Sequence, residues 1–247
     1  MKRKNVFGIL LMLSCMAAFV SCSQETDTDD RGFMSQATVA KSKEGKYLCY
    51  LDGGGIVTSK SAVLDGIERG YFAFMYKEYQ RKTSGKKELF IDDAVVAGFK
   101  KYRVAYPLTI KEAKERGITD PENREENTEF LLSGACRGFF DVVVGTSVRN
   151  RSTGEVAGTK VYLVYDPGNQ TPNTLMFKLY RNPGVSKTWT AKEIVKETVS
   201  YDISSLYSLQ NWADSVTIIV DGGEEIQPFK ISRNDFIKPD INIDLNN

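Results

Sequence analysis

Side chains that commonly carry out catalysis are only partly represented in this chain of 247 residues. The sequence contains no histidine, which is the most frequent general base and metal ligand. Catalytic Ser-His-Asp and Cys-His arrangements are therefore excluded, and so are most zinc sites. We accordingly expect a protein that is not an enzyme, with no catalytic residue, no cofactor and no metal site.

Carboxylates are the remaining candidates for acid–base chemistry, because glycoside hydrolases use two of them and need no histidine. Asp92, Asp93 and Asp141 lie in or near stretches that we expect to be strands. Carboxylates at strand edges are more often solvated than catalytic. A glycan-active hydrolase therefore remains an alternative to a binding protein.

Cys22 is the residue to which the sequence assigns a reaction. It follows three basic residues, an apolar stretch over 6–20 and the small residue Ser21. A basic start followed by about fifteen apolar residues is typical of a secretory signal, and it is too short to span a bilayer as a helix. The run Phe19-Val20-Ser21-Cys22 resembles the lipobox of bacterial lipoproteins, although Phe19 stands where leucine is usual. The resemblance implies cleavage before Cys22 and a diacylglycerol on its thiol.

After a signal peptide at 1–21, residues 22–36 are expected to form an acidic tether. Segment 23–35 reads SQETDTDDRGFMS and has almost no apolar residues, as expected of a solvated linker. Acidic residues directly after a lipidated cysteine resemble the signal that sends lipoproteins of Bacteroidetes to the cell surface. We therefore expect an outer-membrane lipoprotein, with surface exposure as the finer hypothesis.

Of the four cysteines, Cys15 lies within the apolar leader and Cys22 is the expected site of the lipid. The other two belong to the folded chain. An extracytoplasmic compartment permits a disulfide between Cys49 and Cys136. Both stand in apolar surroundings, which favours two buried free thiols. The disulfide remains open as the alternative.

The charge of the mature chain is nearly balanced. The leader contains three basic residues and no acidic one, which leaves 30 basic against 32 acidic side chains. Net charge therefore does not favour nucleic acid as a partner, and we expect membrane attachment to come from the lipid. A further partner, a protein or a glycan, remains unidentified.

Residues 37–110 show short apolar runs separated by turn signals, which is typical of β structure. Tyr47 to Leu51 leads into Asp52-Gly53-Gly54-Gly55, a hairpin signature. About five short strands in such a length suit a small closed barrel, and we expect an OB-like β-barrel.

A ligand-binding face of this barrel has weak candidates. Phe72, Phe74 and Tyr76 share one face of a predicted strand, and Arg81 and Lys82 lie in the basic loop that follows. Aromatic platforms with basic neighbours bind single strands or sugars in OB-folds. Aromatic residues at strand spacing are, however, more often part of the core.

The rest of the chain divides into a linker, a sandwich and a tail. Residues 111–128 are polar, with a short helix predicted because Thr109 can cap it and Glu112 stands three residues on. Seven alternating stretches over 129–237 predict an antiparallel β-sandwich of immunoglobulin-like architecture. They are 130–133, 139–148, 160–166, 174–182, 197–203, 215–221 and 227–232. Residues 238–247 form a polar tail.

This order of parts resembles the NigD-like lipoproteins of Bacteroidetes. The stretches that carry the resemblance are Tyr50-Leu51-Asp52-Gly53-Gly54-Gly55, Leu131-Leu132-Ser133-Gly134, Leu179-Tyr180-Arg181-Asn182 and Val199-Ser200-Tyr201-Asp202-Ile203-Ser204. Arg181 stands where the family usually has histidine. The resemblance implies a two-domain all-β fold and an envelope location, and it assigns no catalytic residue.

The sequence therefore predicts a lipid-anchored binding or interaction module that is not an enzyme. The alternatives are the glycan-active hydrolase and a structural accessory subunit of an outer-membrane assembly, which would dock through exposed sheet edges.

Overall fold

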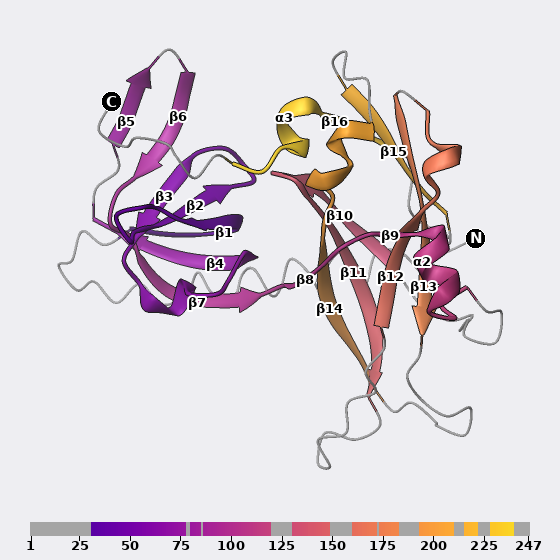
Figure 1. Cartoon of the computed structure of the whole chain (residues 1–247). Helices are drawn as coiled ribbons and strands as arrows, with labels where there is room; N and C mark the ends of the chain where they lie inside the picture. The colour runs from indigo at the N-terminus through magenta and orange to yellow at the C-terminus, as the bar shows by residue number, and fades with distance from the viewer. Residues whose placement is uncertain are drawn as a thin grey trace, which may run out of the picture. The chain divides into compact units, whose positions relative to one another are not determined.

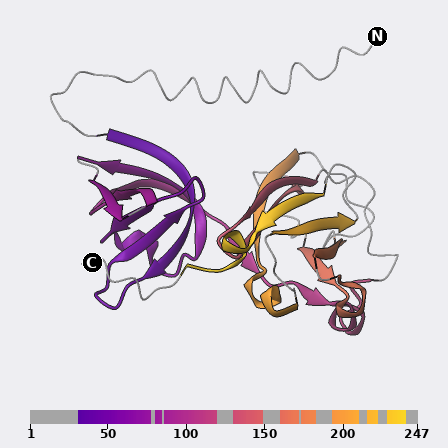
Figure 2. The ribbon, with the colours of Figure 1, turned by 90° about the horizontal axis from the view of Figure 1, so that it is seen from above.

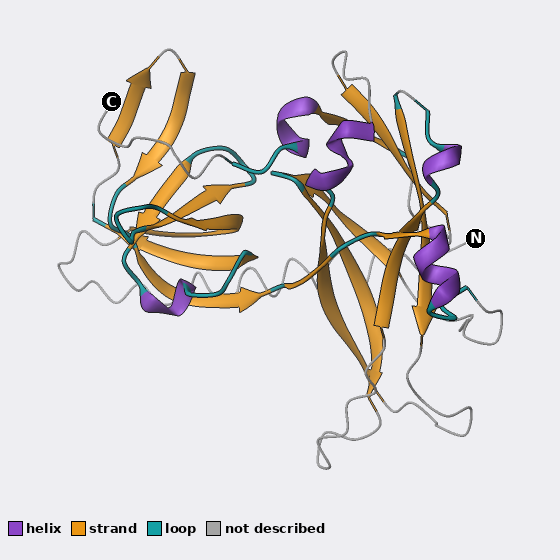
Figure 3. Cartoon of the chain, in the orientation of Figure 1, coloured by secondary structure: helices purple, strands orange, loops and turns teal. Residues whose placement is uncertain are grey.

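The structure is a computed structural model that describes residues 31–77, 80–84, 86–119, 130–148, 160–171, 173–182, 193–209, 215–221 and 228–239. Within these ranges strands predominate and the helices are short (Figure 3). The all-β class expected from the sequence is confirmed. The stretch Arg31–Asn247 forms one compact unit.

Seven strands build an N-terminal sheet (Figure 1). They are β1 (Arg31–Lys41), β2 (Tyr47–Leu51), β3 (Ile56–Ser59), β4 (Arg69–Tyr76), β5 (Gln80–Ser84), β6 (Lys86–Ile91) and β7 (Val95–Lys101). Their spatial order is β5-β6-β3-β2-β1-β4-β7, in which β3 and β6 are parallel and the other neighbours antiparallel. The predicted glycine turn joins β2 to β3, with Gly54 at a φ of 92° and Gly55 at 104°.

A closed OB barrel over 37–110 is not confirmed. The described sheet ends in β5 on one side and in β7 on the other, and these two end strands do not pair. The first strand also begins at Arg31, inside the stretch expected to be tether. The reason is that Phe33 packs on β4, with its ring centroid 5.4 Å from that of Phe74 and 5.9 Å from that of Tyr76.

The N-terminal sheet curls around an apolar core (Figure 2). Successive side chains of a strand point to opposite faces. In β4, Phe72 and Phe74 are therefore fully buried, whereas Tyr71 and Met75 on the other face are exposed. The short helix η1 (Ala62–Leu64) adds a buried leucine to the same core.

Seven later strands match the alternating stretches predicted over 129–237. They are β10 (Phe130–Cys136), β11 (Phe139–Val148), β12 (Lys160–Tyr165), β13 (Thr174–Asn182), β14 (Glu193–Asp202), β15 (Ser215–Asp221) and β16 (Phe229–Ser232). They divide between a four-stranded and a five-stranded sheet.

These two sheets pack face to face. Val142 and Val199 of the four-stranded sheet and Leu163, Leu175 and Ile218 of the five-stranded sheet are fully buried in one core. The fully antiparallel, immunoglobulin-like arrangement is not confirmed, because β13 and β15 are parallel neighbours. The strand between them in sequence, β14, lies in the other sheet, so the chain re-enters the five-stranded sheet in the same direction.

Two short strands after β7 complete the sheets of the sandwich. β8 (Arg103–Ala105) pairs in parallel with β14, and β9 (Leu108–Thr109) pairs in parallel with β12. The orders are β10-β11-β14-β8 and β16-β15-β13-β12-β9. Both stretches fall within the region 37–110 that the sequence predicts to be a barrel, because their distant partners leave no local signal.

The helix α2 (Ile110–Glu115) covers part of the outer face of the five-stranded sheet. The hydroxyl of Thr109 accepts a hydrogen bond from the backbone N–H of Glu112, whose carboxylate accepts one from the backbone N–H of Thr109. This is the capping box that the sequence predicts. Ala113 packs against Val164 of β12, so the helix has its own small core.

The remaining helices are η3 (Pro167–Asn169), η4 (Ser204–Leu209) and α3 (Arg233–Phe236). No helix among the described residues is long and apolar enough to cross a membrane. Half of the expected linker, from 120 on, and the tail from 240 on lie outside the described residues.

Candidate functional site

The aromatic residues that the sequence marks as ligand candidates belong to the core. Phe72 and Phe74 are fully buried, and Tyr76 packs against the same cluster. The rings of both phenylalanines stabilise the N-terminal sheet and are not available to stack on a ligand. Arg81 and Lys82 lie in β5, and their side chains are outside the described part of the chain, as is the whole of Cys22.

Cys49 and Cys136 are both free thiols, as the sequence analysis favours. Cys49 is fully buried and Cys136 is partly buried. Burial raises the pKa of each thiol to about 12. Neither cysteine is therefore a thiolate nucleophile near neutral pH.

The three carboxylates considered for hydrolysis serve other contacts. A hydrogen bond from the hydroxyl of Thr58 lowers the pKa of Asp92. Asp93 forms an exposed ion pair, and Asp141 is only 1% exposed. A glycosidase acid needs a raised pKa and contact with its substrate. Neither Asp92 nor Asp141 suits that role.

Arg69 is the centre of a buried ionic cluster that links the N-terminal sheet to the four-stranded sheet. Its guanidinium is 1% exposed and donates to both carboxylate oxygens of Asp52 at 2.5 Å. It also donates to Oδ2 of Asp141 in β11 at 2.6 Å and to the hydroxyl of Thr38 at 3.1 Å. The hydroxyl of Ser200 donates to the other oxygen of Asp141. The cluster thus spans two sheets.

This cluster is structural. Burial lowers the pKa of Arg69, but its two aspartate partners raise it more strongly, so the guanidinium stays charged. Its Nε has no hydrogen-bond partner within the described part of the chain. Asp141 interrupts the apolar run Phe139–Val144, which indicates a buried charge in the sequence. The sequence does not indicate which residue pairs with it.

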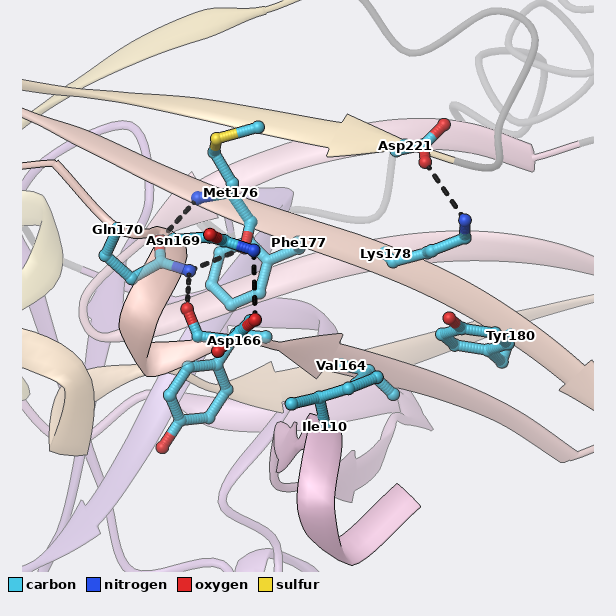
Figure 4. Close-up of a pocket in the computed structure, with 11 residues that line it drawn as sticks. Ile110, Val164, Asp166, Asn169, Gln170, Met176, Phe177, Lys178, Tyr180 and Asp221 are labelled. Atoms are coloured by element: carbon cyan, nitrogen blue, oxygen red, sulfur yellow. Dashed lines mark hydrogen bonds and ion pairs between the residues drawn. The ribbon is translucent and has the colours of Figure 1, made fainter. Parts of the chain in front are cut away.

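A hollow of about 250 Å³ lies on the outer face of the five-stranded sheet, beside α2 (Figure 4). Val164 of β12 and Tyr180 of β13 belong to its floor, and Ile110 of α2 lines it from the helix side. Met176 of β13 also lines it and is 43% exposed. The hollow therefore offers apolar surface to a partner.

One wall of the hollow is the turn that follows β12. The carboxylate of Asp166 accepts hydrogen bonds from Gly168 N at 3.0 Å and from Asn169 Nδ2 at 2.9 Å. The side-chain amide of Gln170 accepts from Met176 N at 2.7 Å and donates to Met176 O at 3.1 Å, as the backbone of a neighbouring strand would. The wall is therefore fixed before any partner binds.

Another wall carries an exposed ion pair. The ammonium of Lys178 lies 3.3 Å from Oδ2 of Asp221, and their side chains are 41% and 73% exposed. The same ammonium lies 5.7 Å from the ring centroid of Tyr180. Exposed ion pairs contribute little to stability. Lys178 or Asp221 can therefore pair with a charge on a bound partner with little loss of stability.

The hollow suits non-covalent binding. Its acids, Asp166 and Asp221, are engaged with the turn and with Lys178, and no cysteine, serine or threonine lines it. Across the described residues, no group of three or more Cys, Asp or Glu side chains is placed to hold a metal ion. The sequence does not predict this hollow, because Ile110 reaches it from a distant segment.

Comparisons with known proteins complete the description. No protein-family model and no curated protein matches the chain, whereas several solved structures do. A NigD-like immunity protein is among them. That protein, from Bacteroides caccae, is 14% identical with a TM-score of 0.45, and the match covers 81% of this chain and 92% of that one. A "Putative lipoprotein" from Bacteroides fragilis is 12% identical with a TM-score of 0.49, covering 82% and 98%. The structural matches thus include a NigD-like protein, the family that the sequence resembles.

Proposed function

We propose that this chain is a lipid-anchored protein of the cell envelope that binds a partner and catalyses no reaction. The observation that carries the proposal is the hollow beside α2. It combines an apolar floor with a fixed wall and an exposed ion pair, and the residues lining it include no free nucleophile or activated acid. Apolar concave surfaces with a few placed polar groups are typical of binding sites.

The partner that fits this hollow is a protein segment with an apolar side chain next to a charged one. The apolar side chain would lie over Val164 beside Met176. Its charged neighbour would displace one member of the Lys178–Asp221 pair. Aromatic rings also line the hollow, but Phe177 and Tyr180 are only 3% and 8% exposed and form no open stacking platform. The apolar floor and the ion pair therefore suit a peptide better than a sugar, which binds on exposed stacked rings.

The lipid on Cys22 would hold the protein at the outer membrane, with the acidic tether favouring the cell surface. Two acyl chains hold a protein stably, whereas one does so only marginally. The Cys22→Ala variant should be unprocessed or released from the membrane fraction, and Cys15→Ala, within the leader, is the matched control. Membrane retention of Cys22→Ala with unchanged mobility would rule out the lipid anchor.

A photo-crosslinking amino acid at Met176 in intact cells tests the binding site. We expect one discrete adduct that is lost when Lys178→Glu is added, because that change turns the ion pair with Asp221 into a repulsion. The same crosslinker at Val63, an exposed residue of η1, is the control. Equal adducts at both positions, or none at Met176, would contradict a binding role for the hollow.

The two alternative functions make different predictions. An accessory subunit would crosslink through the end strands β7 or β16 and not through the hollow. A hydrolase would turn over polysaccharide and lose that activity in Asp92→Asn or Asp141→Asn. The lowered pKa of Asp92 and the burial of Asp141 favour neither variant as a catalytic knockout.

A further inference from the structure

The outward face of β1, β4 and β7 is unusually apolar. Met34, Tyr71, Met75 and Val95 are 50%, 38%, 38% and 62% exposed. We call these four residues the apolar face. They are four of the nine large hydrophobic side chains that are exposed among the described residues.

Strand register makes the apolar face continuous. Met75 of β4 pairs with Val95 of β7, and on its other side it pairs with Gly32 of β1. Met34 pairs with Ala73, which places it diagonal to Met75. A Cβ built on Gly32 would lie 3.0 Å from Sδ of Met75, so the methionine side chain extends over the bare backbone of β1. The side chains of three strands therefore form one surface.

The charged residues within these three strands have one sign. The sequences of β1, β4 and β7 contain five basic residues and no acidic residue. One of the five, Arg69, is buried in the ionic cluster, whereas Lys100 pairs with Tyr71 and is exposed on the same outward face. Arg31 and Lys101 are also exposed, but they pair with Tyr76 and Gly70 and so belong to the opposite face of their strands. The ammonium of Lys100 thus stands beside the apolar face, where it can meet an anionic headgroup.

The chain between the proposed lipid and the apolar face is short. Nine residue steps separate Cys22 from Arg31, the first residue of β1. Even when fully extended they span at most about 32 Å. Met34 is three residues further along the same strand. The lipid would therefore hold the apolar face near the bilayer at a high effective concentration.

We propose that the apolar face of β1, β4 and β7 docks on a lipid bilayer with anionic headgroups, an inference that rests on the lipid anchor proposed above. Met34, Met75 and Val95 insert among the headgroups and the upper acyl carbons. Tyr71 lies at the interface, where amphipathic rings are favoured, and Lys100, its neighbour on β7, faces lipid phosphates. The protein then rests on the membrane with a defined side, and its sandwich remains free for a partner.

Quenching by brominated lipids tests this docking. The lipidated mature chain carrying Val95→Trp is reconstituted in vesicles of phosphatidylcholine and phosphatidylglycerol with bromine on the acyl chains. The signal of the two natural tryptophans, measured in the parent chain, is subtracted. Interfacial insertion of about 5–10 Å should remove about half of the added emission.

Val63→Trp is the matched control, because Val63 is an exposed valine of η1, near the end of β1 that is farther from Met34. It lies two residues from Asp65, which pairs with Lys41 at 3.3 Å. Lys41 is seven residues from Met34, about 23 Å along the strand. We expect little quenching at Val63 when Val95 is quenched. Equal quenching at both positions would overturn the proposal.

A second variant separates docking from anchoring. Met34→Glu together with Met75→Glu, added to Val95→Trp, should reduce the quenching at least about two-fold while the protein still floats with the vesicles. If the chain leaves the vesicles entirely, the lipid anchor itself has failed. If it floats but Val95→Trp is never quenched, docking is refuted and the anchor stands. If the apolar face becomes shielded from solvent only as the protein concentration rises, a second copy of the chain covers it. That result would also overturn the proposal.

Discussion

Replacement of Arg69 by methionine tests whether the ionic cluster joins the two halves of the described structure. Arg69 and Asp141 are each 1% exposed, whereas Asp52 is 20% exposed. Without the guanidinium, Asp52 can gain water, but Asp141 cannot. Removing one partner of a buried ion pair costs about 3–5 kcal/mol. We expect Arg69→Met to lower the free energy of unfolding by about 3–5 kcal/mol.

The double variant Arg69→Met with Asp141→Asn identifies the source of the loss. If the penalty arises from the buried charge of Asp141, neutralising that charge should recover about 1–3 kcal/mol relative to Arg69→Met. Arg103→Met is the control, because Arg103 pairs with Glu197 at 3.7 Å with both side chains about 40% exposed. An exposed pair of this kind contributes no more than about 1 kcal/mol.

Urea unfolding followed by fluorescence and by circular dichroism measures these differences. A loss of stability changes the midpoint at constant slope, whereas uncoupling of the two halves splits the transition or lowers the slope. The reasoning is refuted if Arg69→Met is no more destabilising than Arg103→Met. It is also refuted if the double variant is as unstable as the sum of its two single variants.

Three further predictions concern single positions. Because burial raises the pKa of Cys49 and Cys136 to about 12, a thiol reagent at pH 8 should leave both unmodified in the native chain and label both in urea; rapid native labelling would contradict this. Thr109→Ala removes the capping box of α2 and should cost about 1 kcal/mol, measured as a midpoint shift; no shift would mean that the cap contributes nothing. Gly138→Ala should lower the free energy of unfolding by about 1–3 kcal/mol, because φ is +81° and the new Cβ would lie 2.8 Å from Cγ of Lys238. Gly53→Ala is the control: its Cβ would have nothing within 4 Å, and it should be nearly neutral in the same assay.

Local patterns predicted much of this fold. Three strands, Phe139–Val148, Thr174–Asn182 and Ser215–Asp221, begin and end at the residues that alternation indicates. In β15 the burial of every second residue follows the sequence pattern. The capping box of α2 was also predictable, because its partners are three residues apart.

Features that depend on distant pairing were not predictable. The expected barrel of about five strands is a sheet of seven, because β1 extends into the predicted tether and β5 joins the edge. The hollow beside α2 depends on a helix brought to β12 from far along the chain. The ionic cluster needs Arg69 to meet Asp141, and a buried charge in a strand indicates only that some partner exists.

The short strands β8 and β9 determine when this protein can finish folding. Both leave the ribosome before their partners β14 and β12, so their backbone groups must stay unpaired until most of the chain has been synthesised. A fragment that starts after Thr109 would expose the edges of β12 and β14, and open edges invite pairing with other chains. The two β regions are therefore not modules that can be exchanged by cutting the chain between them.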